Sequence, residues 1–181
     1  IAELATTLDR MPDVGIAAPV LKYPSGEPQG NARRFPSLWT LVMNRTSLGG
    51  TSAGRRWVER DRHASSESRV VYVDWALGAC LLIRHEALRQ LEGMDGRYFL
   101  YCEDVDLCAR AWQCGWEVVL VPSSEVVHEY QRDSKATWDL RRKTTRAHWV
   151  SLLKMYRRYP SMLVDSRRIS DKHGLPATAG E

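Results

Sequence analysis

Three carboxylates directly follow an aromatic and apolar segment in the middle of the chain, where residues 98–110 read YFLYCEDVDLCAR. Glu103, Asp104 and Asp106 mark the point at which the sequence stops reading as extended and starts reading as helix. Acids at a helix N-terminus accept hydrogen bonds from its first N–H groups and face the positive end of its dipole, so helix capping is one interpretation. A carboxylate at such a junction beside an apolar wall is also well placed to act as a general base.

The residues after this acidic cluster predict an amphipathic helix. Asp106 and Arg110 have the i,i+4 spacing of an acid–base pair on one side of it, which contributes about a few tenths of a kcal/mol. Gly115 is a typical helix stop. The other side of the helix is an apolar face at i, i+3, i+4 and i+7, made of Val105, Cys108, Ala109 and Trp112.

Buried strands are predicted on both sides of this helix. Residues 116–121 read as a buried strand that ends at Pro122, and residues 125–128 read as a short second strand that ends on His128.

Residues 44–69 are rich in Gly, Ser and Arg and predict a long mobile loop. The remaining expected elements are a helix with Ile1, Leu4, Leu8 and Met11 on one face, strands at 15–20, 70–73 and 79–83, and a short helix at 85–91.

Residues 93–110 (GMDGRYFLYCEDVDLCAR) resemble the signature of family 2 glycosyltransferases with a GT-A fold, and most closely that of the bacterial rhamnosyltransferase-like branch. The flanking motifs occur in the family's order, and the resemblance covers about residues 1–160. These flanks are residues 12–19, 25–26, 33–37 and 75–84 upstream, and Gly115, Pro122 and His128 downstream.

The resemblance implies an α/β fold, namely the C-terminal portion of a GT-A-type mixed sheet flanked by helices, followed by a C-terminal amphipathic basic helix. It assigns residues 1–135 to an acceptor-binding and catalytic-base half, whereas charge and helical spacing predict the basic helical region at 136–170 and composition predicts a disordered tail at 171–181. The family's N-terminal nucleotide-binding half carries an Asp-x-Asp motif, and no such motif precedes residue 74. We therefore expect a piece of a longer enzyme that is inactive alone.

The function implied by the resemblance is inverting transfer of a sugar, rhamnose by analogy with the branch, from a nucleotide-sugar donor to a cell-envelope glycan or lipid-linked acceptor. Asp104, the second acid of the Glu-Asp pair, corresponds to the catalytic base. Glu103 is expected to bind an acceptor hydroxyl or to cap the helix. The alternative is a non-catalytic binding module that keeps the fold but cannot bind the donor.

The resemblance also implies a divalent metal, Mn²⁺ or Mg²⁺, with His128 as a ligand, since imidazole is an acceptable ligand for such ions. A structural histidine at a strand end is the alternative. Arg132 and Ser134 follow His128 and are expected to reach the donor diphosphate.

The segment that begins at Trp75 is expected to bind the acceptor. Trp75 could stack against an acceptor sugar or pack in the core. Gly78 either lets the acceptor approach the backbone closely or marks a strand bend. Ala79 lies beside it on the same acceptor-side segment.

The C-terminal end of the chain is basic. From residue 132 onward it has twelve Lys or Arg and five Asp or Glu, whereas the formal net charge of the whole chain is +4. The basic helix either presents a solvated face or docks on an anionic membrane surface, and no recognised nucleic-acid module accompanies the charge. Its apolar face, expected to pack on the domain, is Trp149, Leu152, Leu153 and Tyr156.

The cysteine pattern favours a reducing compartment. Cys80, Cys102, Cys108 and Cys114 contain no Cys-x-x-Cys pair and lie in apolar segments, which predicts buried free thiols rather than a zinc site. A cytoplasmic protein, peripheral on the inner face of the cytoplasmic membrane if the basic face docks there, is the localisation that follows.

Overall fold

The computed structural model of the 181-residue chain describes residues 1–60, 69–129 and 141–164. Its centre is a mixed four-stranded sheet in the order β3-β6-β1-β5. These strands are β1 (Val14–Lys22), β3 (Val71–Tyr72), β5 (Leu82–Ile83) and β6 (Glu117–Val127). β1 and β6 are parallel and central, while β3 and β5 pair antiparallel at the two edges. A second, two-stranded sheet joins β2 (Ala32–Arg33) to β4 (Trp75–Ala76).

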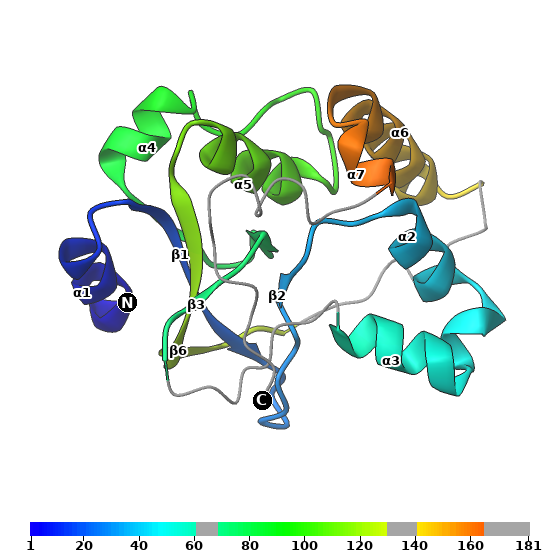
Figure 1. Cartoon of the computed structure of the whole chain (residues 1–181), viewed down its shortest axis with the longest axis horizontal. Helices are drawn as coiled ribbons and strands as arrows, with labels where there is room; N and C mark the ends of the chain where they lie inside the picture. The colour runs from blue at the N-terminus through cyan, green and yellow to red at the C-terminus, as the bar shows by residue number, and fades with distance from the viewer. Residues whose placement is uncertain (61–68, 130–140, 165–181) are drawn as a thin grey trace.

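The central strands are apolar on both faces because each face is covered. α1 (Ala2–Arg10) covers one face, where Leu4 and Leu8 pack against side chains of β1 and β6. The larger core lies on the other face, under α5 (Glu103–Gln113) (Figure 1). Strand side chains point alternately to the two faces. Val14, Ala17, Val119 and Val121 face α1, whereas Ile16, Ala18, Val20, Val118 and Leu120 face the larger core.

Three predicted elements are present. The helix and the strand at the start of the chain are α1 and β1, and the helix predicted at residues 85–91 is α4 (His85–Gln90). The two strands predicted at 116–121 and 125–128 are instead one strand, β6. Val121 pairs with Pro19 and Glu125 with Val20, so the intervening residues form a bulge. Pro122 lies in that bulge, where its missing N–H removes no ladder hydrogen bond, and the strand therefore continues past it.

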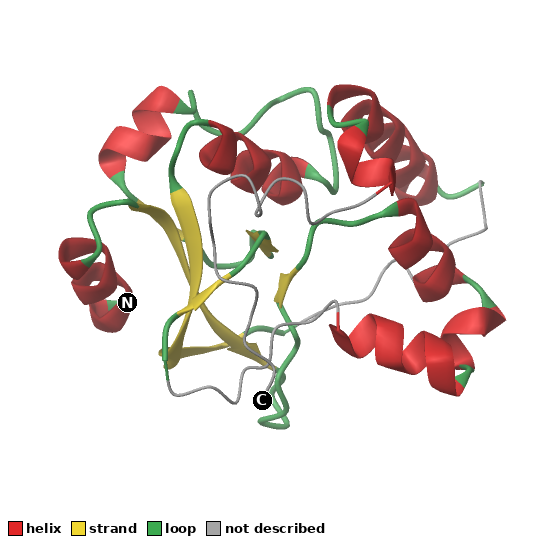
Figure 2. Ribbon diagram, in the orientation of Figure 1, coloured by secondary structure: helices red, strands yellow, loops and turns green. Residues whose placement is uncertain are grey.

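The prediction of a long mobile loop at residues 44–69 was wrong for much of that range. α2 (Leu38–Arg45) is followed by a 3-10 helix, η1 (Ser47–Gly50), and by α3 (Ser52–Arg60), while residues 61–68 lie outside the described ranges (Figure 2). Thr51 caps α3, because its Oγ1 accepts a hydrogen bond from the Gly54 N–H at 3.0 Å. The Gly- and Arg-rich composition therefore did not reveal the capped helix α3.

The C-terminal helices α6 (Lys143–Arg158) and α7 (Ser161–Val164) join the larger core beside α5 (Figure 1). Leu152 is buried, and Trp149 and Tyr156 are partly buried against the same core, as expected. Leu153 is not part of this face, since it is 62% exposed. No helix in the described part of the chain is long and apolar enough to cross a membrane.

Asp106 forms the predicted ion pair with Arg110, at 2.8 Å, but not on a solvated side of the helix. Its side chain is completely buried, because the C-terminal end of α6 covers it. The Tyr159 hydroxyl donates to Asp106 Oδ1 at 2.8 Å, and the Arg158 Nε lies 3.5 Å from the same oxygen. This carboxylate therefore joins α5 to α6 inside the protein.

The cysteine prediction was only partly right. All four thiols are free, and Cys102 and Cys108 are buried. Cys80 is half-buried and Cys114 is exposed, because Cys114 lies just past the end of α5.

Candidate active site

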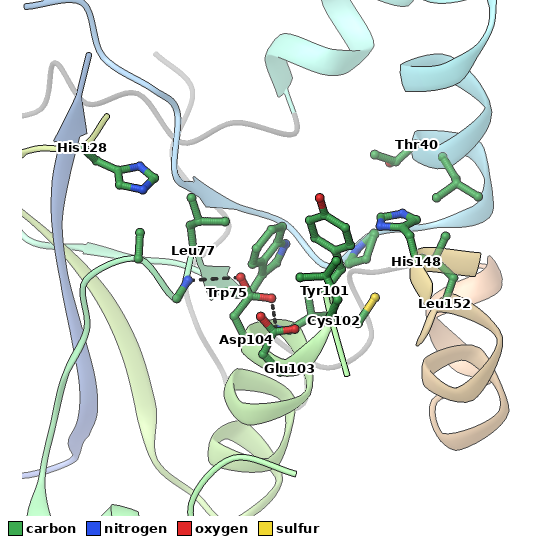
Figure 3. A pocket seen from close by; sticks show the side chains of 16 residues that line it. Thr40, Trp75, Leu77, Tyr101, Cys102, Glu103, Asp104, His128, His148 and Leu152 are labelled. Carbon is green, nitrogen blue, oxygen red and sulfur yellow. Dashed lines mark hydrogen bonds between the residues drawn. The ribbon is translucent and has the colours of Figure 1, made fainter. Parts of the chain in front are cut away.

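A pocket of about 470 Å³ lies where the N-terminus of α5 meets β4, α2 and α6. Six of the eight predicted site residues line it: Trp75, Gly78, Ala79, Glu103, Asp104 and His128. Figure 3 shows the two acids in the middle of the pocket, with His128 toward one end and His148 toward the other. Arg132 and Ser134, predicted to reach the donor diphosphate, lie outside the described residues.

The backbone turns sharply just before the acidic pair. Tyr101 and Cys102 both adopt left-handed conformations, with φ of +65° and +69°. Such a conformation costs a non-glycine residue about 1–3 kcal/mol and persists only where the surrounding structure imposes it. Here it starts α5 at the pocket wall, so that the first two helical residues, Glu103 and Asp104, face the pocket.

Asp104 is a buried carboxylate held by two backbone N–H groups. Its Oδ2 accepts from Gly78 at 3.1 Å, and its Oδ1 accepts from Val105 at 2.8 Å. The pKa of Asp104 is raised to about 6, chiefly because the carboxyl group is buried; the N–H of Gly78 opposes this shift, and the nearby charge of Glu103 adds to it. The group is therefore ionised at neutral pH and more basic than an exposed aspartate, as a general base should be. It also binds an N–H of its own helix, so capping and general-base chemistry are compatible.

Glu103 has a polar atom that no described residue satisfies. Its Oε2 is buried and has no hydrogen-bond partner among the described residues. Buried oxygen atoms of this kind are rare in folded proteins, and a bound ligand is one reason for them. Because Glu103 lines the pocket, a ligand hydroxyl could donate to this oxygen.

Trp75 and Gly78 have structural tasks of their own. The Trp75 indole N–H donates to the Arg34 carbonyl at 2.7 Å, so the ring, rather than the N–H, remains for contact with a ligand. A Cβ at Gly78 would lie 3.3 Å from the Cβ of Asp104. The absence of a side chain there lets the backbone approach the carboxylate of Asp104. This reason for glycine differs from both expectations, which were close approach of the acceptor and a strand bend.

His128 directly follows β6 and is held on both its backbone and its ring. Its backbone N–H donates to the Lys22 carbonyl at 2.9 Å, and its Nδ1 lies 3.0 Å from the Gln29 Oε1. The described residues contain no group of three or more His, Cys, Asp or Glu side chains able to hold a metal ion. His128 could thus contribute one imidazole ligand, with other ligands coming from a donor diphosphate or from outside the described chain.

The sequence did not indicate the opposite end of the pocket. Thr40 and Leu41 of α2 and His148 and Leu152 of α6 line it. His148 meets the Tyr101 ring edge-on, with centroids 4.7 Å apart. The i,i+4 spacing of His148 and Leu152 places them on one helix face, but nothing local says that α6 returns to the Glu-Asp motif.

Known proteins resemble this chain in sequence and in fold. N-acetylglucosaminyl-diphospho-decaprenol L-rhamnosyltransferase from Mycobacterium tuberculosis is 38% identical over 128 residues, which are 71% of this chain and 41% of that protein. Rhamnosyltransferase WbbL from Escherichia coli K12 is 36% identical over 64 residues, 35% of this chain and 24% of that protein. The chain thus spans well under half the length of these curated relatives.

A solved structure of GalNAc-T7 with UDP, GalNAc and Mn²⁺ matches 96% of this chain and 37% of its own, with a TM-score of 0.53 and 17% identity. That likeness concerns the fold, and it agrees with the expected GT-A-type mixed sheet flanked by helices. Residues 30–173 match the sequence family described as glycosyl transferase family group 2. This chain therefore belongs to glycosyl transferase family group 2, and within it resembles the rhamnosyltransferases.

Proposed function

We propose that this chain carries the acceptor-binding and catalytic-base part of an inverting rhamnosyltransferase. The observation that carries the proposal is Asp104, a buried carboxylate with a raised pKa on the wall of a pocket. Rhamnose is proposed as the sugar because two curated relatives are rhamnosyltransferases. The acceptor is proposed to be a lipid-linked or cell-envelope glycan, as the name of the mycobacterial relative suggests.

In the proposed reaction, Asp104 takes the proton of an acceptor hydroxyl as that oxygen attacks C1 of the sugar. The new C1–O bond forms on the face opposite the departing nucleoside diphosphate, which leaves with the electron pair of the broken C1–O bond, so the configuration at C1 inverts. A divalent cation, when bound, would neutralise the charge that develops on this leaving group. His128 would help hold it, and Arg132 and Ser134 would contact the diphosphate.

The acceptor is proposed to lie between Glu103 and the segment from Trp75 to Ala79. The buried Glu103 Oε2 would accept a hydrogen bond from a second acceptor hydroxyl, which would orient the sugar toward Asp104. The Trp75 ring would provide an apolar surface for the sugar face. The apolar end of the pocket, between α2 and α6, remains for the rest of the acceptor.

The exposed side of α6 is proposed to meet an anionic membrane leaflet on the cytoplasmic side, where a lipid-linked acceptor would be presented. One stripe of this helix combines basic and apolar side chains: Lys143, Arg146, Val150, Leu153 and Arg157, all exposed. Basic residues near an anionic bilayer contribute roughly 1 kcal/mol each, and small apolar groups between them can enter the interface.

The experiment that tests the proposed function is a transfer assay on the whole protein, with nucleotide-linked rhamnose and a lipid-linked GlcNAc acceptor. NMR of the product reports whether the anomeric configuration inverts. Asp104→Asn should lower turnover roughly 10²–10⁴-fold while donor binding is retained. Glu103→Gln should mainly raise the KM for the acceptor. Normal turnover by a folded Asp104→Asn protein would refute the assignment of the base.

A further inference from the structure

We infer that Gln29 is a positioning residue that keeps neutral His128 in the Nδ1–H tautomer, so that the lone pair of the ring resides on Nε2. The inference rests on the proposed function only for what that lone pair binds, which would be a divalent cation or another electron-pair acceptor. Gln29 and His128 are far apart in sequence, and nothing in the local pattern around Gln29 indicates a site residue.

A hairpin brings Gln29 to His128. The chain turns after β1, where the Gly26 N–H donates to the Tyr23 carbonyl at 2.8 Å and Gly26 adopts a φ of +89°. The returning segment runs along the end of β1, and the Gln29 backbone N–H donates to the Leu21 carbonyl at 2.8 Å. His128 extends the parallel strand on the other side of Lys22. Gln29 is therefore fixed by its backbone before its side chain makes any contact.

Two carbonyl groups determine the orientation of the Gln29 amide. Its Nε2 donates to the carbonyl of Lys22, at 3.1 Å, and also to the carbonyl of His128. The flipped amide would turn Oε1 toward these two carbonyl oxygens, and none of the three atoms could donate. The amide nitrogen therefore faces the carbonyls, and Oε1 faces His128 Nδ1 at 3.0 Å.

The tautomer of His128 follows from this orientation. A carboxamide oxygen only accepts hydrogen bonds, so Nδ1 must donate and must carry a proton. In the neutral ring the other nitrogen, Nε2, then holds the lone pair. A hydrogen bond of this kind sets both the tautomer and the orientation of histidines that bind metals through the second nitrogen.

The neutral amide is chemically suited to this task in a way that a carboxylate is not. A glutamate at position 29 would also accept from Nδ1, but its negative charge would favour the imidazolium form, in which Nε2 is protonated and cannot bind a cation. Glutamine fixes the proton on Nδ1 without adding a charge that would hold a second proton on the ring.

The direct test is ¹⁵N–¹H correlation NMR of the whole protein labelled at histidine, free of metal and at a pH where His128 is neutral. Ring ¹⁵N shifts distinguish the tautomers, and the signal is assigned with His128→Asn. Wild-type protein should show Nδ1–H. Gln29→Met, similar in size but with only a weakly accepting thioether, should move His128 toward the Nε2–H form that free imidazole side chains prefer.

Gln90→Met is the matched control, because the Gln90 Oε1 accepts from the Trp116 indole elsewhere in the protein. It should leave the His128 signals unchanged. An Nε2–H tautomer in the wild type overturns the inference, even if Gln29→Met does not fold, and so does an unaltered tautomer in folded Gln29→Met.

A second measurement separates this inference from the proposed function. Mn²⁺ added with a nucleoside diphosphate should broaden the His128 ring signals of the wild-type protein and should do so less in Gln29→Met. If the wild type shows the Nδ1–H tautomer but Mn²⁺ leaves His128 unaffected, Gln29 remains the positioning residue and the metal-binding role of His128 fails.

Discussion

The backbone N–H of Gly78 donates to Asp104 Oδ2 at 3.1 Å, across 26 residues of sequence. The two residues lie so close that a Cβ added at Gly78 would come within 3.3 Å of the Cβ of Asp104. This pair joins the segment that follows β4 to the first turn of α5 and sets where the carboxylate lies in the pocket (Figure 3). Its geometry gives the first prediction.

Gly78→Ala should displace Asp104 by a few tenths of an ångström and lower turnover by about 10-fold, because small misplacements of a catalytic group are costly. Donor binding should be unchanged. Steady-state kinetics of the whole protein measures the effect. Gly96→Ala is the matched control, since a Cβ there meets nothing within 4 Å, and its kinetics should equal those of the wild type. Equal rates for the two variants would show that the contact does not position the base.

Relative to the wild type, the Asp104→Asn protein should gain stability as the pH rises from 4 to 8. The pKa of Asp104 is raised from 3.8 to about 6, so the folded state binds the proton more tightly than the unfolded state. The free energy of unfolding of the wild type therefore falls as pH rises from about 4 to 6, by about 2–3 kcal/mol from this group. Asparagine cannot ionise and avoids this loss.

Urea denaturation of both proteins at pH 4 and pH 8 tests this stability prediction. The advantage of Asp104→Asn should grow by about 2 kcal/mol between the two pH values. Equal pH dependence of the free energy of unfolding in both proteins would mean that the pKa of Asp104 is not raised.

Catalysis should require ionised Asp104, so kcat/KM should increase tenfold per pH unit below about pH 6 and level off above it. In Glu103→Gln the midpoint of this rise should move to lower pH, because the charge of Glu103 contributes to the raised pKa. A pH–rate profile of the two proteins gives both midpoints. A midpoint near pH 4 in the wild type would contradict the prediction.

Tyr159→Phe should destabilise the fold by about 1–3 kcal/mol, because it removes a hydroxyl that donates to the fully buried Asp106 carboxylate. Tyr156→Phe, three residues earlier in the last turn of α6, is the matched control. Its hydroxyl donates to the Pro36 carbonyl at a longer 3.2 Å in a partly buried position, so the loss should be about 1 kcal/mol or less. Chemical denaturation ranks the two variants, and a reversed order would count against Asp106 as the link between α5 and α6.

Charge reversal at Lys143, Arg146 and Arg157 should release the protein from vesicles that contain anionic lipid, without unfolding it, because all three side chains are exposed. Binding of the wild type should weaken with added salt. Arg158 is unsuitable for this test, since it forms an ion pair with Asp95 at 3.0 Å and lies close to Asp106. Vesicle sedimentation measures binding, and equal binding to neutral and anionic vesicles would leave the basic face as a solvated surface.

The sequence by itself determined the elements whose signals are local. Continuous apolar runs identified the core strands, the 3.6-residue period identified α5, and the Glu-Asp motif with its flanks identified the family. The same motif and its flanks predicted Asp104, Glu103 and His128 as site residues, and all three line one pocket. The elements and the family could be predicted because backbone preference and side-chain pattern depend on a few neighbouring residues.

Only the tertiary structure decided what depends on distant segments. The bulge at Pro122 follows from the pairing of β6 with β1, and the burial of Asp106 follows from the packing of α6 on α5. The raised pKa of Asp104, the place of His148 in the pocket and the contact of Gln29 with His128 likewise need both partners in position. Desolvation and hydrogen-bond geometry depend on what surrounds an atom in space, and a linear pattern does not contain that information.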